Sequence, residues 1–338
     1  MRPVRCGSPR YVLAVALCCA LVAPLAACED EAPPPTDTRS VRLGVSKESL
    51  NALAYIARDE KLFDDVGLEV ELVEHDSAQA AFEAMMAGEV DAALCADTPI
   101  VTAAIEGEPF NVIATVATDN NDLKVVARAS AGIATASDLR GRRVGTRQGT
   151  AAHFFLHVLL TKYGMNDTDV DVRFDSFESV TAALIEGDLD AVSLRQPFIA
   201  QLETALGDDF VLIEEEGIYG KTMNLCVLAD EQGADAEVQR RLVEAFILAE
   251  KAGVADTSGR IVANVASDIG IESHDICSCI ITRGAVELEQ SLVLNLEDQV
   301  RWAMESGLAT AETPPDVLSF IDPGPLDAVA PERVTLVR

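Results

Sequence analysis

Two segments of the sequence, 81–100 (AFEAMMAGEVDAALCADTPI) and 180–199 (VTAALIEGDLDAVSLRQPFI), share one pattern. Each contains a helical stretch, then Gly-acid-aliphatic-Asp-Ala, a short apolar strand and a proline that opens the next helix. The corresponding Gly, Asp and Pro positions are 99, 99 and 98 residues apart. Copies this far apart predict two lobes of similar build, because the units of a solenoid repeat at much shorter intervals. A chance likeness between two βα units is the alternative.

Strands and helices alternate from Val41 onward, which is typical of an α/β fold. The first three predicted strands are at 41–45, 68–73 and 90–95. With 338 residues and 49% hydrophobic composition, the chain can form two domains. We predict a first lobe from 41–127 and 223–338, and a second lobe from 128–222. The apolar strands at 123–128 and 222–229 are predicted to cross between the lobes.

The segment 139–166 contains no Asp or Glu, although the chain has 56 acidic residues against 26 basic ones. It predicts a strand at 142–147, a turn at Gln148-Gly149 and a helix whose N-cap is Thr150. First helical turns usually attract acids, because the helix N-terminus carries positive partial charge. Here the first turn is Ala151-Ala152-His153, so this open helix end predicts a binding site for an external anion. A solvated basic patch on an ordinary βα unit is the alternative.

Residues 1–28 are similar to a bacterial lipoprotein signal. Three arginines flank the start of an apolar stretch at 11–23 that is short for a membrane span, and Leu25-Ala26-Ala27-Cys28 is similar to a lipobox. Residues 29–40 are acidic and Pro-rich, which predicts a tether. We therefore expect lipidation at Cys28 and a lipid-anchored place in the cell envelope, in the periplasm or on the outer face of the cytoplasmic membrane. A plain anchor helix is the alternative.

Composition excludes several functions. The net charge of −30 and an aromatic content of 5% argue against nucleic-acid binding. The sequence contains no Gly-x-Ser-x-Gly, P-loop or His-Glu-x-x-His motif, so we predict no catalytic residue and no cofactor.

Two groups of residues have some of the features of a metal site. His153 and His157 share a helix face at a spacing that can bind a metal, but no Glu lies between them. His274 precedes Cys277-Ser278-Cys279, but this spacing fits no standard zinc pattern. We therefore predict no metal. Export permits disulfides, but no pairing follows from the sequence among the cysteines beyond the lipobox, which are Cys95, Cys226, Cys277 and Cys279.

Five segments carry further motifs, in a specific order. They are AYIARDEKLFDDVG at 54–67 with the strand that follows, SDLRGRRV at 137–144, QGTAAHFFL at 148–156, GDLDA at 187–191 with Pro197-Phe198, and the helix from Arg301-Trp302 to Gly307-Leu308. Together they resemble the periplasmic substrate-binding lipoproteins of ABC importers, in the nitrate, sulfonate, taurine and thiamine-precursor group. The resemblance implies a two-lobe periplasmic-binding-protein fold (type II, Venus-flytrap) with two crossing strands and a ligand cleft between the lobes.

The resemblance also implies which residues contact the ligand. In the second lobe they are Gly149, Thr150, Ala151, His153, Arg195 and Gln196. In the first lobe and the return crossing they are Ser46, Asn51, Asp97, Thr98, Tyr219 and Asn224. We expect the N–H groups of Ala151 and Ala152 to donate to an anionic head group, Arg195 to clamp it, and Asp97 to suit an amine. The alternatives are a surface salt bridge for Arg195, a helix cap for Asp97 and a role for His153 in shaping the cleft.

We therefore expect a monomeric, non-catalytic receptor. It would capture a small anionic or zwitterionic organic ligand, similar to a sulfonate, taurine, nitrate or a thiamine precursor. It would deliver this ligand to an ABC permease, and its indirect partner through the permease would be an ATPase. Leu194-Arg195-Gln196 departs from the pattern of sulfonate binders, which leaves the ligand open. The alternatives are an enzyme of the same fold that resembles a pyrimidine-precursor synthase, and a ligand sensor without transport.

Overall fold

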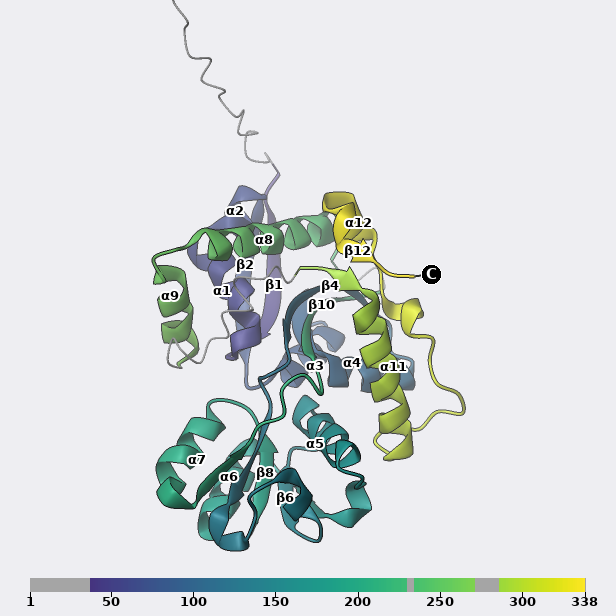
Figure 1. The fold of residues 1–338 in the computed structure, drawn as a ribbon. Helices are drawn as coiled ribbons and strands as arrows, with labels where there is room; N and C mark the ends of the chain where they lie inside the picture. Colours follow the sequence, from purple (N-terminus) through teal and green to yellow (C-terminus); the bar gives the residue numbers. More distant parts are fainter. Residues whose placement is uncertain (1–36, 230–233, 271–285, 338) are drawn as a thin grey trace, which may run out of the picture. The chain divides into compact units, whose positions relative to one another are not determined.

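The computed structural model describes residues 37–229, 234–270 and 286–337, which belong to one compact unit, Pro34–Arg338. The predicted lipidation site Cys28 and the residues His274, Cys277 and Cys279 lie outside the described residues. Within the described ranges, no helix combines the length and the hydropathy that a membrane span needs. The predicted α/β fold is confirmed: two five-stranded sheets form the centres of two lobes (Figure 1).

The sheet of the first lobe has the strand order β2-β1-β3-β10-β4. Strands β1 (Arg39–Ser46), β2 (Leu68–His75) and β3 (Ala92–Ala96) are parallel, and Arg39 of β1 lies opposite Leu68 of β2. Strand β10 (Lys221–Leu228) is antiparallel to both β3 and β4 (Phe110–Asp119). Every residue of β3 and β10 is buried, as expected for strands that are covered on both faces.

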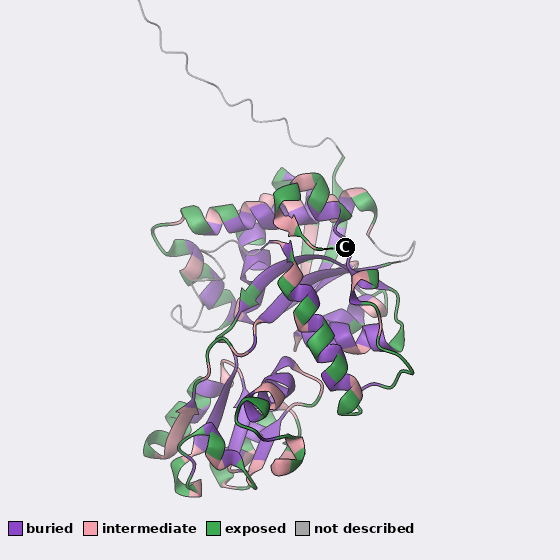
Figure 2. Cartoon of the chain, turned by 45° about the vertical axis from the view of Figure 1, so that its right-hand side comes forward, coloured by how far each residue is buried: buried purple, intermediate pink, exposed green. Residues whose placement is uncertain are grey.

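Helices cover this first sheet. They are α1 (Ala52–Asp59), α2 (Leu62–Asp65), α3 (Ala78–Met86), α4 (Asp97–Glu106), α8 (Ala236–Ala255), α9 (Arg260–Ile269), α11 (Gln290–Glu305) and α12 (Gly324–Val329). Helix α8 packs against α1, α2 and α12, and α11 packs against α4 (Figure 1). A short parallel pair, β11 (Leu288–Glu289) and β12 (Val334–Thr335), joins the start of α11 to the C-terminal segment. Exposed residues lie mainly on the outer faces of the helices, and the strands between them are largely buried (Figure 2).

The sheet of the second lobe has the order β7-β6-β8-β5-β9. Its strands are β5 (Lys124–Arg128), β6 (Arg143–Thr146), β7 (Asp171–Phe174), β8 (Ala191–Leu194) and β9 (Phe210–Ile213). Strands β6, β7 and β8 are parallel, whereas β5 is antiparallel to β8 and β9. The helices of this lobe are α5 (Ala151–Lys162), α6 (Phe177–Glu186) and α7 (Phe198–Leu206).

Both sheets therefore have one plan: three parallel strands, then an antiparallel strand, then a fifth strand. In each lobe the antiparallel strand is the first strand that the chain forms after it crosses from the other lobe. The chain leaves the first lobe after β4 and enters β5, and it returns after β9 into β10. The predicted division at residues 127 and 128 falls at the end of β5, and the division into domains stays a prediction.

The repeated Gly-acid-aliphatic-Asp-Ala pattern has the same role in both lobes. The carboxylate of Asp91 accepts hydrogen bonds from the backbone N–H and the guanidinium of Arg42, both at 2.8 Å. The carboxylate of Asp190 accepts the same two bonds from Arg143, at 2.9 and 2.7 Å. The glycine three positions earlier has a φ of 73° in the first copy and 87° in the second, which is the left-handed region that favours glycine. The repeat thus fixes the first parallel strand of each lobe to the loop before the third.

Candidate functional site

A cavity of about 50 Å³ lies between the lobes, at the carboxyl ends of their parallel strands. First-lobe residues that line it are Glu48, Ser77, Ala78, Gln79, Ala96, Pro99 and Lys221. Those from the outward crossing and the second lobe are Leu123, Arg147, Thr150, Ala151, Ala152, Phe177 and Arg195. Ala96 ends β3, and Arg147 and Arg195 directly follow β6 and β8, so the topology brings them to one place. A buried water needs about 10–15 Å³ of such space, so the cavity suits a compact chemical group.

The N-terminus of α5 forms one wall of this cavity. The hydroxyl of Ser193 in β8 donates to the carbonyl of Ala152 at 2.8 Å, which holds the first turn of α5 on the sheet. Thr150 occupies the N-cap position as predicted, but its hydroxyl donates to the carbonyl of Arg147 at 2.7 Å and does not cap the helix. In the described ranges, the backbone N–H groups of Ala151 and Ala152 meet no acceptor. These two donors are free for a ligand, as the acid-free segment predicted.

Arg147 brings a guanidinium to the cavity without a partner. Its neighbours in the acid-free segment are paired, Arg140 with Asp169 and Arg143 with Asp190. No acid or hydrogen-bond acceptor among the described residues binds the guanidinium of Arg147, which is half-buried. An unpaired guanidinium beside free helix N–H groups is a strong recognition element for an oxyanion.

A buried cluster of charges forms the opposite wall. Lys221 Nζ donates to Glu48 Oε2 at 2.7 Å and to Asp122 Oδ2 at 2.9 Å. Arg195 Nε lies 3.9 Å from Glu48 Oε2, and its Nη1 donates to the carbonyl of Gln196 at 3.0 Å. Burial alone would raise the pKa of Glu48, but the charges of Lys221 and Arg195 lower it to about 2. Burial alone would lower the pKa of Lys221, but Asp122 and Glu48 raise it above its usual value. Glu48 and Lys221 are therefore charged at neutral pH.

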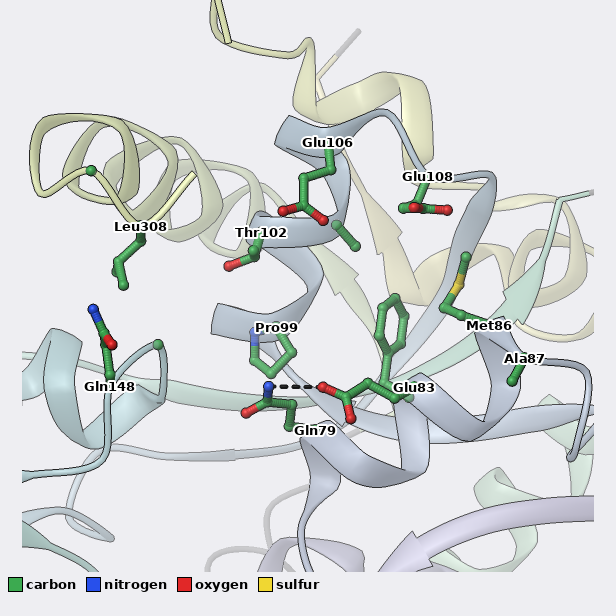
Figure 3. A pocket seen from close by; sticks show the side chains of 14 residues that line it. Gln79, Glu83, Met86, Ala87, Pro99, Thr102, Glu106, Glu108, Gln148 and Leu308 are labelled. Atoms are coloured by element: carbon green, nitrogen blue, oxygen red, sulfur yellow. Dashed lines mark hydrogen bonds between the residues drawn. The ribbon is translucent and has the colours of Figure 1, made fainter. Parts of the chain in front are cut away.

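A larger groove of about 670 Å³ continues from the cavity, and the two share Gln79 and Pro99 as lining residues. Figure 3 shows Gln148 and Leu308 on one side of this groove and the thioether of Met86 on another. The groove is open to solvent on its outer side and mixes apolar and polar side chains. It can therefore hold the body of a molecule whose head group lies in the small cavity.

Two residues predicted to contact the ligand in the first lobe instead lie behind Glu48. Ser46 Oγ donates to Glu48 Oε1 at 2.6 Å, and Asn51 Nδ2 donates to Ser46 Oγ at 2.9 Å. All three side chains are buried, but only Glu48 lines the cavity. Ser46 and Asn51 hold Glu48 in place, and their direct contact with a ligand stays a prediction.

Four other predicted residues lie in the interior of the first lobe and do not line the cavity, namely Asp97, Thr98, Tyr219 and Asn224. The buried carboxylate of Asp97 accepts from the hydroxyl of Tyr219 at 2.6 Å and from Asn295 Nδ2 at 2.9 Å. Thr98 donates to Gln299 at 2.7 Å, and Asn224 donates to Thr222 at 2.9 Å. Burial raises the pKa of Asp97, although the hydrogen bonds that its carboxylate accepts from Tyr219 and Asn295 oppose the shift. The network joins the start of α4 to α11 and to the return crossing.

His153 faces an aromatic cluster and is not among the cavity-lining residues. Its Nδ1 accepts from the backbone N–H of Gly149 at 3.4 Å. Its ring meets the edges of Phe174 and Trp302, with centroids 4.7 and 4.9 Å apart. Burial lowers the pKa of His153 to about 4, so the ring is neutral at pH 7. His153 therefore packs α5 against α11, and we expect it to add no positive charge to the cavity.

The family model described as NMT1/THI5 like matches residues 51–259 of the chain. The chain belongs to the NMT1/THI5-like family. It is also 22% identical, over 161 residues, to the putative aliphatic sulfonates-binding protein of Escherichia coli (strain K12). That alignment covers 47% of this chain and 50% of the relative, so the chain spans about half the length of the curated relative it matches.

Two solved structures share the fold of this NMT1/THI5-like chain. The alkanesulfonate-binding protein SsuA from Xanthomonas axonopodis pv. citri, bound to MOPS, superposes with a TM-score of 0.70 at 18% identity, over 86% of this chain and 99% of that one. The periplasmic nitrate-binding protein NrtA from Synechocystis PCC 6803 gives a TM-score of 0.68 at 13% identity, over 88% and 90%. These two matches confirm the predicted periplasmic-binding-protein fold. The family model and the curated relative support the predicted resemblance to the group that includes sulfonate binders and thiamine-precursor proteins.

The described cysteines of this NMT1/THI5-like chain are not poised for chemistry. Cys95 and Cys226 are free and buried, and burial raises the pKa of both thiols. Among the described residues, no group of three or more His, Cys, Asp or Glu side chains is placed to hold a metal ion.

The sequence analysis missed four charged residues at or beside the cavity, namely Glu48, Asp122, Arg147 and Lys221. Arg147 could have been found, because it directly follows a predicted strand in the acid-free segment. Lys221 and Glu48 each lie next to an apolar strand, which is an unusual place for a charge without a function. Their pairing across the lobe has no signal in the sequence.

Proposed function

We propose that the chain is an extracytoplasmic solute-binding receptor that captures a small organic anion with a sulfonate-like head group. The observation that carries this proposal is the meeting, in one interlobe cavity, of the free guanidinium of Arg147 and the two unpaired N–H groups of Ala151 and Ala152. These donors come from one side of the cavity, and the lining residues of the first lobe close the other side.

The hydrogen-bonding capacity of the cavity supports an oxyanion. The guanidinium and the two N–H groups together provide at least three donors, and a bond to a charged acceptor contributes roughly 1.5–3 kcal/mol. Three such bonds are consistent with micromolar affinity after the costs of association. The N-terminus of α3 also faces the cavity through Ser77, Ala78 and Gln79, and its positive end favours the same charge.

The groove beside the cavity supports an organic substituent on the head group. A head group held at Arg147 has open space of about 670 Å³ beyond Gln79 and Pro99 for its body. The names of the relatives agree with this class of ligand: one is a putative aliphatic sulfonates-binding protein, and SsuA was crystallised with MOPS. The nitrate-binding protein NrtA shows that the same fold serves a small inorganic anion in a relative.

In this proposal the chain is a monomer, is not an enzyme, and closes its two lobes around the ligand. A ligand that contacts both lobes binds the closed form more tightly, and so shifts the equilibrium toward it. The closed form then docks on an ABC permease, which its ATPase drives. Lipidation at Cys28 would hold the receptor at the membrane.

The experiment is a panel of anions tested by thermal unfolding and by calorimetry on the purified full-length chain. The panel is nitrate, methanesulfonate, longer alkanesulfonates, taurine and an aromatic carboxylate. We expect alkanesulfonates to raise the melting temperature in a concentration-dependent way, because a ligand that binds only the folded state stabilises it by mass action. Absence of binding by every member would refute the proposal. Binding with turnover of one member would support an enzyme instead.

A further inference from the structure

The charges at the cavity do not balance. Three cations, Arg147, Arg195 and Lys221, line it. There are two carboxylates: Glu48 lines the cavity as well, and Asp122 pairs with Lys221. Among these five side chains, one positive charge therefore remains without a counter-ion. Side chains of the cluster other than Arg147 are at most 13% exposed, so solvent ions screen the charges of these four groups only weakly.

Glu48 is the acid that faces the ligand directly. It lines the cavity, whereas Asp122 reaches the cluster from the far side of Lys221. Ser46, itself fixed by Asn51, donates to its second carboxylate oxygen at 2.6 Å. The carboxylate is thus held by contacts on both oxygens and stays next to the bound head group. It neutralises part of the positive charge that would otherwise be available to the ligand.

Building on the proposed function, we propose that Glu48 is a specificity-determining residue, an internal counter-ion that makes the cavity select singly charged over doubly charged anions. A sulfonate or nitrate brings one negative charge and balances the one unpaired positive charge. A sulfate ion brings two, so one buried negative charge is left unpaired beside the carboxylate of Glu48. Uncompensated charge and like-charge repulsion are both strongly unfavourable in a site of low dielectric constant.

The test compares methanesulfonate with sulfate, because both ions are tetrahedral at sulfur and differ in one substituent, a methyl group or an oxygen, and in one charge. Calorimetry on the full-length chain at pH 7 and constant ionic strength gives both dissociation constants. We expect the wild-type chain to bind methanesulfonate more tightly than sulfate by at least about tenfold. In Glu48→Gln we expect sulfate to bind more tightly, so that this ratio falls by about tenfold or more. The glutamine amide oxygen can still accept from Lys221, and its NH2 group can donate to the hydroxyl oxygen of Ser46.

A matched control is Glu60→Gln. Glu60 does not line the cavity, and its Oε1 lies 2.7 Å from Nη1 of Arg260. Its replacement changes the net charge of the chain by the same amount as Glu48→Gln. We expect this variant to keep the wild-type ratio. Asp122→Asn is a second variant that removes one negative charge from behind Lys221. We expect it to shift the ratio in the same direction as Glu48→Gln, and it decides the question if Glu48→Gln does not fold.

The outcomes separate this inference from the proposed function. Binding of methanesulfonate with an unchanged ratio in the folded variants would overturn the role of Glu48 and leave the receptor proposal standing. Wild-type protein that binds sulfate as tightly as methanesulfonate would do the same. Wild-type protein that binds neither these ions nor any other anion of the panel would overturn both.

Discussion

Replacement of Arg147 by glutamine tests the anion site most directly. The guanidinium lines the interlobe cavity, and no described residue pairs with it, so its hydrogen-bonding capacity is unused in the absence of a ligand. Two of its N–H groups can donate to one oxyanion, and each bond to a charged group contributes roughly 1.5–3 kcal/mol. Arg147 is half-buried, so the lower value is appropriate because water screens the interaction. Arg147→Gln should therefore weaken binding by about 3 kcal/mol, or roughly a hundredfold.

The stability of the ligand-free protein gives an independent check. Because Arg147 has no ion pair to lose, its replacement should change the free energy of unfolding by less than about 0.5 kcal/mol. The assay is calorimetric titration with the tightest sulfonate of the panel, together with urea unfolding of the free protein. Arg147→Lys should give an intermediate affinity, since a lysine keeps the charge but not the planar pair of donors.

The control for this variant is Arg173→Gln. Arg173 lies in β7 of the same lobe, its side chain is 65% exposed, and it pairs with Asp171 at 2.7 Å on the surface. The change in net charge is identical, so any long-range electrostatic effect on the ligand appears in both variants. Affinity of Arg147→Gln within about threefold of wild type would refute the assignment of this residue to the site.

Three further predictions concern stability. Burial lowers the pKa of His153 to about 4 from its usual 6.5, so the unfolded chain takes up this proton first as the pH falls. Between pH 7 and pH 4 the free energy of unfolding of wild type should therefore fall by about 3 kcal/mol more than that of His153→Phe, and equal falls in urea titrations would contradict this. Lys221→Met leaves the carboxylates of Glu48 and Asp122 without their shared cation and should cost about 3–5 kcal/mol by urea unfolding; a cost below about 1 kcal/mol would show that water or Arg195 compensates. Gly145→Ala places a Cβ against a leucine and a valine of the repeat and should cost about 1–3 kcal/mol in the same measurement, whereas an unchanged midpoint would mean that these side chains move aside freely.

The two-lobe fold could be predicted because its repeat depends on local structure. In each copy one aspartate, Asp91 or Asp190, follows a glycine with positive φ and ties the loop before the third parallel strand to the first. These requirements fix residue types at short spacings, so they remain visible in a single sequence. The open N-terminus of α5, where we propose that an anion binds, could be recognised for the same reason, since a helix N-terminus without acids is a property of a few consecutive residues.

The contribution of the first lobe was not predictable in this way. Ser46, Asn51 and Asp97 follow the ends of strands, which is why they were expected in the cleft. Inside the lobe, Ser46 donates to Glu48, Asn51 Nδ2 donates to Ser46 and Asp97 accepts from Tyr219, whereas the buried Oδ1 of Asn51 has no partner among the described residues. Whether a side chain turns toward the cavity or toward the interior depends on partners far away in sequence. Position at a strand end does not decide between the two.

The charge cluster shows how the topology places site and hinge together. Glu48 and Lys221 are 173 residues apart, and Lys221 and Asp122 are 99 apart, yet Glu48 and Lys221 line the cavity together and Asp122 pairs with Lys221 beside it. Asp122 lies in the outward crossing and Lys221 begins the return strand, whereas Glu48 and Arg195 belong to opposite lobes. Strand β10 is antiparallel to β3, and β5 is antiparallel to β8. Each of these two strands therefore begins at the end of its sheet where the parallel strands have their carboxyl ends. The residues that connect the lobes therefore also border the cavity, as Leu123 of the outward crossing and Lys221 of the return strand show.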